Sequence, residues 1–312
     1  MKSMSAKSEN DEPAKPEATD LIPAFSGGGS VVHPRLERSI GAILLDAGRI
    51  TIEDSERILQ AQRDSQLPFG EAGKSLGILQ QADIDFALSR QFEYPYLVRG
   101  ETRVSESLVA AFDPSRPEIE ALRALRSQLM LRWFDSDPAH RALTVISAAA
   151  GEGRSFIAAS LAIVFAQLGQ RTLLVDGDLR KSQQHELFGL DNRFGLSAML
   201  SGRAGPEAIQ PIPGLRNLFV LPAGVCPPNP QEVLARPALT ELLNELCARF
   251  DVVLFDSPPA ASTADAQILT VRTGAALIVT RRDASRFWRV HGISDKVIEA
   301  KATIIGAILN DF

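Results

Sequence analysis

The sequence predicts an α/β fold, in which helices cover both faces of a doubly wound, mostly parallel sheet, preceded by a small helical domain. Short apolar segments alternate with helical patterns from residue 142 to residue 309. A glycine-rich stretch joins the first of these segments to a long helical pattern, and an internal repeat lies upstream. Near-continuous apolar strands between helices are typical of parallel sheets that are buried on both faces.

The order of these elements sets where a ligand should bind. Predicted strands cover residues 142–146, 172–176, 218–221, 252–256, 275–279 and 303–309, and predicted helices cover 117–132, 157–168, 236–250, 265–269 and 287–300. In such sheets, ligands lie beyond the carboxyl ends of the strands. We therefore look for functional side chains directly after each strand.

The composition is that of an ordinary globular protein. Of 312 residues, 45% are hydrophobic and 23% charged, and the net charge of -5 disfavours a nucleic-acid-binding surface. Cys226 and Cys247 lack metal-ligand spacing and indicate no disulfide framework. We find neither an apolar run long enough to span a membrane nor the apolar stretch of a signal peptide. We expect a cytoplasmic protein that reaches the inner membrane only through a partner.

The N-terminal third divides into three segments. Residues 1–34 are rich in charged residues, serine and proline, which predicts a disordered tail. Residues 35–98 carry the repeat and form the predicted helical domain. Residues 99–115 are expected to be a linker onto the nucleotide-binding domain at 116–312.

The repeat has two units that lie 29 residues apart. Gly41 and Gly48 of the first unit match Gly70 and Gly77 of the second. Each unit is predicted to be a short helix, a turn at its second glycine and a further helix, the further helices covering 51–62 and 80–92. Since neither unit buries its apolar face alone, the two should pack together.

The stretch from Ser147 to Phe156 resembles a phosphate-binding loop. The consensus is G-x-x-x-x-G-K-[ST] between a strand and a helix, where backbone N–H groups surround phosphate oxygens. Ala148 stands where the consensus has its first glycine, and Arg154 stands where it has lysine. The loop is therefore degenerate, and further evidence must come from the rest of the chain.

Two later strands end in carboxylates. Asp176 and Asp178 follow the second predicted strand in an Asp-x-Asp-x-Arg pattern that ends at Arg180, and Asp256 ends the strand over 252–256. Magnesium prefers hard oxygen ligands, and phosphoryl transfer needs a base near the acceptor. A lone aspartate at a strand end is more often a cap or turn former, but the three sites in this order favour a nucleotide site.

The helix predicted over 117–132 carries Glu120, Arg123 and Arg126 at intervals of three. From the residues alone, a solvated charged stripe is the simpler interpretation, because such pairs add only a few tenths of a kcal/mol each.

Taken together, the degenerate loop, Asp-x-Asp-x-Arg and apolar-Asp-x-Pro motifs resemble the bacterial tyrosine kinases, relatives of the MinD and ParA P-loop ATPases. Glu120-x-x-Arg123-x-x-Arg126 matches that family's Glu-x-x-Arg-x-x-Arg helix, which builds rings and helps activation. Residues 38–312 are similar to the EpsG subgroup of exopolysaccharide chain-length and export systems. The resemblance implies ATP, Mg2+, self-association into a ring or dimer, and a membrane-embedded chain-length determinant as partner.

The resemblance also assigns roles to residues. The nucleotide would contact Ala150, Gly151, Glu152, Gly153, Arg154, Ser155, Phe156 and Arg180, with Asn310 near the adenine. Ser155, Asp176 and Asp256 would hold the metal. Asp176 and Asp178 would share the duty of catalytic base, assisted by Arg154.

Two departures from the family bear on catalysis. Arginine is longer than lysine, planar and forked, so Arg154 predicts slower phosphoryl transfer. The family phosphorylates tyrosines in its own C-terminal tail, whereas the only tyrosines here are Tyr94 and Tyr96. A kinase would have to use these two or tyrosines of a partner. A MinD-like ATP-dependent switch without kinase activity is the alternative.

The repeat resembles the N-terminal domain of MshE-type secretion and pilus-extension ATPases, some of which bind cyclic di-GMP through an arginine at each opening. Here the openings are Ser39-Ile40-Gly41 and Pro68-Phe69-Gly70, and Arg38 lies one residue out of register. A docking or oligomerisation module is therefore favoured over a cyclic di-GMP sensor.

Overall fold

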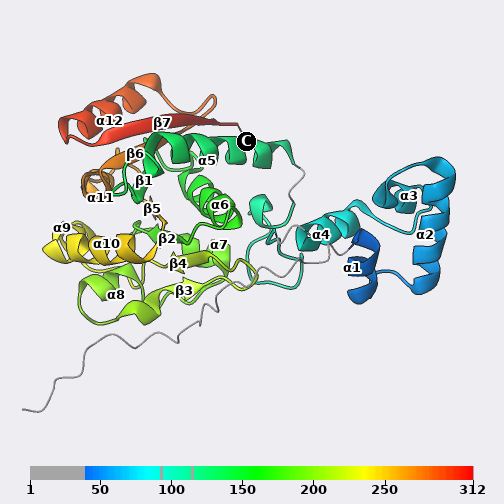
Figure 1. Ribbon diagram of the computed structural model, residues 1–312. Coiled ribbons are helices and arrows are strands. Elements are labelled where there is room, and N and C mark those ends of the chain that lie inside the picture. Colours follow the sequence, from blue (N-terminus) through cyan, green and yellow to red (C-terminus); the bar gives the residue numbers. More distant parts are fainter. Residues whose placement is uncertain (1–38, 92–93, 114–115, 312) are drawn as a thin grey trace, which may run out of the picture. The chain divides into compact units, whose positions relative to one another are not determined.

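The computed structural model describes residues 39–91, 94–113 and 116–311, so the tail predicted for residues 1–34 lies outside the described residues. The C-terminal part is an α/β domain and the N-terminal part is helical (Figure 1). Each part is described by itself.

Within the described residues, the α/β domain contains a seven-stranded sheet of order β3-β4-β2-β5-β1-β6-β7. Its strands are β1 (Ala142–Ser147), β2 (Thr172–Asp176), β3 (Gln210–Pro211), β4 (Leu218–Leu221), β5 (Val252–Asp256), β6 (Ala275–Arg281) and β7 (Thr303–Asn310). All pairings are parallel except that of β3 with β4. The predicted sheet is confirmed, and only the two-residue edge strand β3 is unanticipated.

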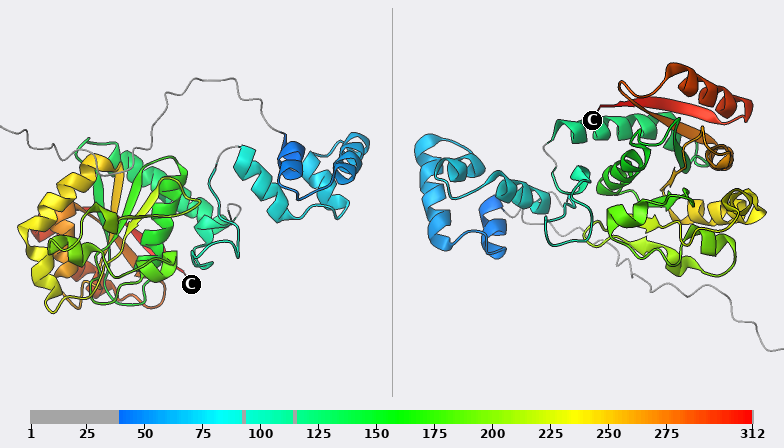
Figure 2. Two further views of the ribbon diagram at one scale, coloured as in Figure 1. Left: turned by 90° about the horizontal axis from the view of Figure 1, so that it is seen from below. Right: turned by 180° about the vertical axis from the view of Figure 1, so that it is seen from behind.

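Helices cover both faces of this sheet (Figure 2). They are α5 (Pro117–Leu129), α6 (Arg154–Gln167), α7 (Gln184–Phe188), α8 (Leu196–Leu200), α9 (Pro230–Ala235), α10 (Pro237–Arg249), α11 (Asp265–Thr273) and α12 (Phe287–Glu299), with a π-helical turn at Met130–Phe134 after α5. Successive strand residues face opposite sides: Leu174 packs with α6, whereas Leu173 and Val175 pack with α8 to α11. This doubly wound arrangement places the ends of β1, β2 and β5 side by side.

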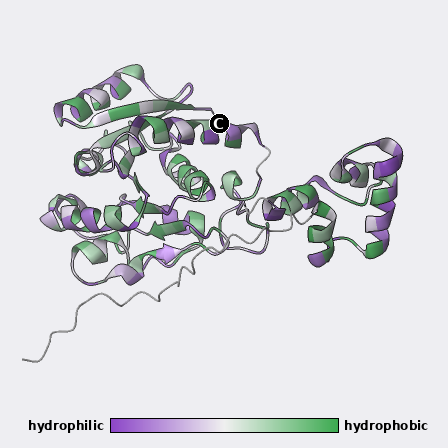
Figure 3. Ribbon diagram, viewed as in Figure 1, coloured by the Kyte–Doolittle hydropathy of each residue, from purple (hydrophilic) through white to green (hydrophobic). Residues whose placement is uncertain are grey.

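Helix α6 runs through the middle of one layer and is buried along almost its whole length. Figure 3 shows its hydrophobic residues as a green stretch beside the sheet. Segment 97–111, predicted to be mostly linker, packs onto it: Leu97, Val104 and Leu108 belong to the same buried core. This segment includes a 3-10 turn at Val109–Ala111, and its burial comes from apolar residues that have no helical or strand period.

The N-terminal part contains α1 (Ile40–Asp46), α2 (Ile52–Ser65), α3 (Phe69–Ser75) and α4 (Gln81–Gln91). Both predicted turns occur at glycines in the left-handed region, with φ of 66° at Gly48 and 67° at Gly77. The two units share one core that includes Ile43, Leu44 and Ile84. The predicted two-unit packing is therefore present, although α2 continues three residues past the expected end at Gln62.

Candidate functional site

The loop between β1 and α6 is shaped by two glycines. Gly151 has φ 79° and Gly153 has φ 87°, and both lie in the left-handed region that favours glycine. Gly153 is the N-cap of α6 and makes no side-chain capping bond. The N–H groups of the first turn of α6 therefore have no capping side chain, and the helix dipole adds positive potential there. This geometry suits an anion such as a phosphate.

Glu152 holds the loop in shape. One carboxylate oxygen accepts the N–H of Ala149 at 2.7 Å, and the other accepts the hydroxyl of Ser285. Asn310 Nδ2 donates to the Glu152 carbonyl at 3.2 Å, and Arg281 Nη1 donates to the Gly151 carbonyl at 3.2 Å. Side chains at the end of β6, shortly after it and at the end of β7 thus brace the loop. Asn310, expected near adenine, lies against this loop.

The strand-end carboxylates converge as predicted. Asp176 and Asp256 are register partners on β2 and β5, and both are fully buried. Asp178 is 4% exposed, and its carboxylate accepts the N–H groups of Arg180 and Lys181. Ser155, also buried, occupies the second position of α6. Three carboxylates and a hydroxyl-bearing residue therefore gather at one edge of the sheet.

Gly177 allows β2 and β5 to stay this close. A Cβ at this position would lie 2.6 Å from the backbone oxygen of Asp256 and 2.6 Å from Leu269 Cδ1. The Gly177 N–H instead donates to that Asp256 oxygen at 2.9 Å. The glycine in Asp-Gly-Asp is thus required by the approach of the neighbouring strand.

Arg154 lies inside the site and makes three polar contacts. Its Nε donates to Asp256 Oδ1 at 3.0 Å and its Nη1 to Ser147 Oγ at 3.0 Å, while Nη2 lies 3.5 Å from Asp178 Oδ2. Its side chain is 9% exposed. The length and fork of arginine let it span both strand ends, which the compact amine of lysine cannot do. In this state the guanidinium neutralises the carboxylates.

Asp176 has the most perturbed ionisation of the site. Burial, followed by the negative charge of Asp256, raises its pKa to about 8. Backbone N–H groups of Asp178, Gln183 and Gln184 donate to its carboxylate and oppose the shift only in part. A carboxyl group whose pKa lies near neutrality suits a proton acceptor.

Gln184 is a site residue that no motif indicated. Its Nε2 donates to Asp256 Oδ2 at 2.8 Å and to the Ser155 carbonyl at 3.1 Å. Its Oε1 is buried without a hydrogen-bond partner in the described part of the chain. Arg180, predicted to contact the nucleotide, pairs in this structure with Asp265: its Nε lies 3.0 Å from Asp265 Oδ2. Only the position of Gln184 shortly after the Asp-x-Asp strand could have suggested its role.

The side chains gathered at this edge of the sheet fit a nucleotide phosphate chain with Mg2+. The buried Gln184 Oε1 lacks a partner beside the carboxylates, and magnesium takes oxygen ligands and keeps several waters. Across the described residues, no cluster of three or more His, Cys, Asp or Glu side chains is arranged to hold a metal by itself. The predicted set of Ser155, Asp176 and Asp256 contains only two carboxylates, and it stays a prediction.

The helix predicted to carry Glu120, Arg123 and Arg126 is α5, and these three residues differ in environment. Arg123 Nη1 pairs with Glu120 Oε2 at 3.0 Å at the surface. Arg126 is buried, and its Nη1 donates to the Val164 carbonyl of α6 at 2.9 Å. Arg126 thus fixes α5 on α6, and a stripe solvated along its whole length, the simpler interpretation, is wrong. A role for these residues in self-association stays a prediction.

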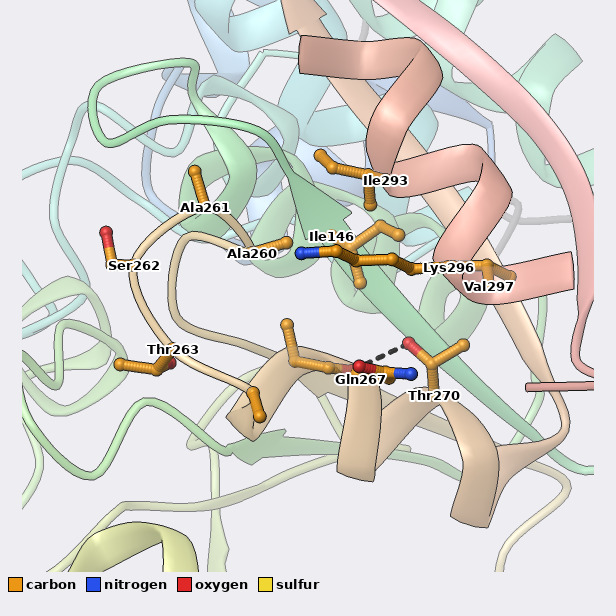
Figure 4. A pocket seen from close by; sticks show the side chains of 12 residues that line it. Ile146, Ala260, Ala261, Ser262, Thr263, Gln267, Thr270, Ile293, Lys296 and Val297 are labelled. Atoms are coloured by element: carbon orange, nitrogen blue, oxygen red, sulfur yellow. Dashed lines mark hydrogen bonds between the residues drawn. The ribbon is translucent and has the colours of Figure 1, made fainter. Parts of the chain in front are cut away.

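A cavity of about 260 Å³ lies away from this constellation, between α11, α12 and the loop after β5. Figure 4 shows Ile146, Ile293 and Val297 in its wall, with the Lys296 side chain pointing across it toward Ala260. Ile146 faces the α12 side of the sheet, whereas its neighbour Val145 faces α6. None of the predicted nucleotide residues lines this cavity.

Comparisons with known proteins agree with this geometry. The ParA family model, described as "NUBPL iron-transfer P-loop NTPase", matches residues 139–310. Tyrosine-protein kinase YwqD of Bacillus subtilis is 34% identical over 67% of this chain and 87% of its own length. The putative tyrosine-protein kinase EpsB of Ralstonia solanacearum is 34% identical over 65% of this chain but only 27% of its own length.

Solved structures give the same result. The chimerical protein CapA2B2 superposes with a TM-score of 0.62 at 33% identity, covering 72% of this chain and 96% of that one. The kinase domain of Escherichia coli tyrosine kinase ETK superposes with a TM-score of 0.62 at 32% identity, covering 65% of this chain and 79% of that one.

No helix of the described residues has the length and hydrophobicity needed to cross a membrane. With a ParA-type P-loop domain and a relative matched over most of its length, the chain belongs to the bacterial tyrosine-protein kinases.

Proposed function

We propose that this chain transfers the γ-phosphoryl group of ATP to tyrosine in an exopolysaccharide export system, together with a membrane-embedded chain-length determinant. The observation that carries the proposal is the convergence of Asp176, Asp178 and Asp256 on the N-terminal turn of α6. Kinship with YwqD and ETK supports tyrosine as the acceptor. The export system rests on the similarity to the EpsG subgroup.

In this proposal each residue has a distinct task. The loop amides at Gly151 to Ser155 bind the phosphate chain, and Ser155, Asp176 and Asp256 hold Mg2+, which supplies positive charge against the phosphates. Asp178 accepts the phenolic proton, or Asp176 does so once it is ionised. Asn310 places the loop against the last strand.

The proposal is tested with the full-length chain, radiolabelled ATP, Mg2+ and a glutamate–tyrosine copolymer as the acceptor. We expect label on tyrosine, loss of that label in Asp178→Asn and Asp176→Asn, and retention in the exposed control Glu241→Gln. Equal labelling by all variants, or none by the native chain with its membrane partner present, would reject kinase function.

One observation favours a second candidate, an ATP-dependent switch without phosphoryl transfer to protein. Arg154 is engaged by Asp256 and Asp178, so ATP binding must break these pairs before the guanidinium can turn to phosphate. Such an exchange of partners could change conformation without catalysing transfer. ATP-dependent assembly in light scattering, with no phosphotyrosine, would identify the switch.

Cyclic di-GMP binding by the helical domain stays a prediction. Calorimetry of the full-length chain with cyclic di-GMP tests it. Absence of heat at micromolar ligand would leave docking or oligomerisation as the role of residues 35–98.

A further inference from the structure

The two tyrosines of the chain, Tyr94 and Tyr96, lie together in a short extended segment. Their ring centroids are 5.2 Å apart and their planes are tilted by 30°. Both side chains are only partly buried.

This segment is anchored to the end of α6 that lies farthest from the phosphate loop. Gln167, the last residue of α6, donates through Nε2 to the Pro95 carbonyl at 3.1 Å and to the Ala110 carbonyl at 2.9 Å. The N–H of Leu97 donates to the Ala111 carbonyl at 2.8 Å, and the Leu97 side chain is buried in the core. The tyrosines therefore have a fixed place on the α/β domain.

Both tyrosines face Arg123 of α5. Arg123 Nη2 donates to Tyr96 Oη at 2.9 Å, and its Cζ lies 5.8 Å from the centre of the Tyr94 ring. The other terminal nitrogen, Nη1, pairs with Glu120 at 3.0 Å. Burial raises the pKa of Tyr96 above its usual range, so this phenol stays protonated at neutral pH. One guanidinium thus joins Tyr96 to Glu120.

We propose that Tyr96 is a phosphorylation site that a second copy of this chain modifies, and that its phosphate draws Arg123 away from Glu120. The proposal rests on the kinase function above and adds an acceptor and a consequence to it.

Transfer must occur between copies because of the length of α6. Arg154 begins this helix and Gln167 ends it, a span of 14 residues. At 1.5 Å per residue, the helix separates the phosphate loop from the carbonyl of Pro95 by about 20 Å. Since the anchored Tyr96 stays at the far end, its hydroxyl cannot reach its own loop.

The chemical step balances without a further reactant. A bond forms between Tyr96 Oη and the γ-phosphorus as the bond from that phosphorus to the bridging oxygen breaks. ADP leaves, and the phenolic proton passes to a carboxylate of the catalysing copy. Tyr96 must leave Arg123 for this step, which costs one partly exposed hydrogen bond.

After transfer, the phosphate replaces a neutral hydroxyl with close to two negative charges beside Arg123. Arginine binds phosphate through two parallel hydrogen bonds, and this pairing is stronger than one with an exposed carboxylate. Glu120, whose side chain is already 74% exposed, would then lose its partner and be repelled by the phosphate. Phosphorylation thereby changes the charge pattern of the helix expected to mediate self-association.

The first experiment maps phosphotyrosine by mass spectrometry on the full chain after incubation with ATP and Mg2+, with the glutamate–tyrosine copolymer in parallel. We expect label on Tyr96, lost in Tyr96→Phe and kept in the matched control Tyr94→Phe, with copolymer labelling unchanged in both. Copolymer labelling without label on Tyr96 would overturn this proposal and leave the kinase function intact. Failure of both reactions would instead count against the kinase function.

The second experiment tests transfer between copies. Asp176→Asn chains carry Tyr96 but lack a catalytic carboxylate. They are mixed with active Tyr96→Phe chains, and mass spectrometry tells the two chains apart by their mass. We expect phosphate on Tyr96 of the Asp176→Asn chain in the mixture and none on that chain alone. An unlabelled Asp176→Asn chain in the mixture, with Tyr96 labelled in the native chain, would overturn transfer between copies.

The third experiment compares the phosphorylated native chain with the same sample after phosphatase treatment. This first comparison needs no substitution. Light scattering should give different assembly states for the two samples, and Glu120→Gln should remove most of the difference. Identical assembly with Tyr96 fully phosphorylated would overturn the proposed effect on Glu120.

Discussion

Arg154 Nε and Asp256 Oδ1 lie 3.0 Å apart in a buried ion pair that joins the phosphate loop to the end of β5. The same guanidinium reaches Asp178, two residues after the end of β2. A residue in the position of the consensus lysine therefore serves as the counter-ion of the carboxylates in this state. Arg154 thus supports the folded site, and its proposed part in catalysis can be tested separately by substitution.

We predict that Arg154→Ala destabilises the protein by about 3–5 kcal/mol, because it leaves buried carboxylates without a counter-ion. Urea unfolding at neutral pH measures this loss. A loss well below this range would show that the buried carboxylates do not depend on this counter-ion.

Arg154→Lys should behave differently, since lysine restores the consensus amine. We expect copolymer phosphorylation to rise by on the order of 100-fold if the arginine is the main obstacle to transition-state stabilisation. Steady-state rates with saturating ATP measure the change. An unchanged or lower rate would show that the site is adapted to arginine.

Asp176 should make stability depend on pH in the metal-free protein. Its pKa is about 8 in the folded state against 3.8 ordinarily, so the folded state keeps a proton that the unfolded chain loses. Between these two values stability should fall as pH rises, and the contribution is complete below the lower one. Unfolding free energies across this range should decline less steeply in Asp176→Asn than in the native chain. Parallel curves for the two proteins would contradict the assignment.

Gly177→Ala should cost about 1–3 kcal/mol, because the added methyl group meets the Asp256 oxygen and Leu269. ATP binding should weaken as well, since the two strand ends must separate. Gly292→Ala is the matched control: a Cβ there meets no atom within 4 Å, and α12 should gain about 0.5–1 kcal/mol from it. Calorimetric melting and ATP titration report both effects.

Gln167→Leu should release the segment that carries the tyrosines. It removes the donor to the Pro95 and Ala110 carbonyls and should cost about 1–3 kcal/mol. Limited proteolysis should then cut between residues 94 and 111 sooner than in the native chain. Gln170→Leu, beyond the end of α6, is the control, and equal cleavage in both would contradict the anchoring role.

The strands and the sites after them were predictable because a parallel sheet buries its strands on both faces and leaves an apolar signature. Thr172–Asp176, Leu218–Leu221 and Val252–Asp256 occur with the expected bounds. Asp176 and Asp256 meet as register partners for the same reason, since strand ends of one direction share an edge.

The contacts of individual side chains were not predictable, because they depend on the three-dimensional approach of distant elements. Arg154 has no sequence signal for pairing with Asp256, 102 positions away. Gln184 lies in a short helix without a motif. Arg123 and Arg126 are only three positions apart on α5, yet Arg126 is buried by α6 whereas Arg123 is partly exposed. Segment 97–111 has no period at all, yet it supplies buried core.

That segment sets a limit on how the gene can be divided. A fragment that begins at Pro117 would strip Leu97, Val104 and Leu108 from α6 and leave the Gln167 amide without its acceptors. A fragment of this chain that keeps these contacts must therefore start before Pro95. A truncation or fusion that keeps these contacts carries Tyr96 along with it, so the proposed acceptor and the catalytic fold remain in one fragment.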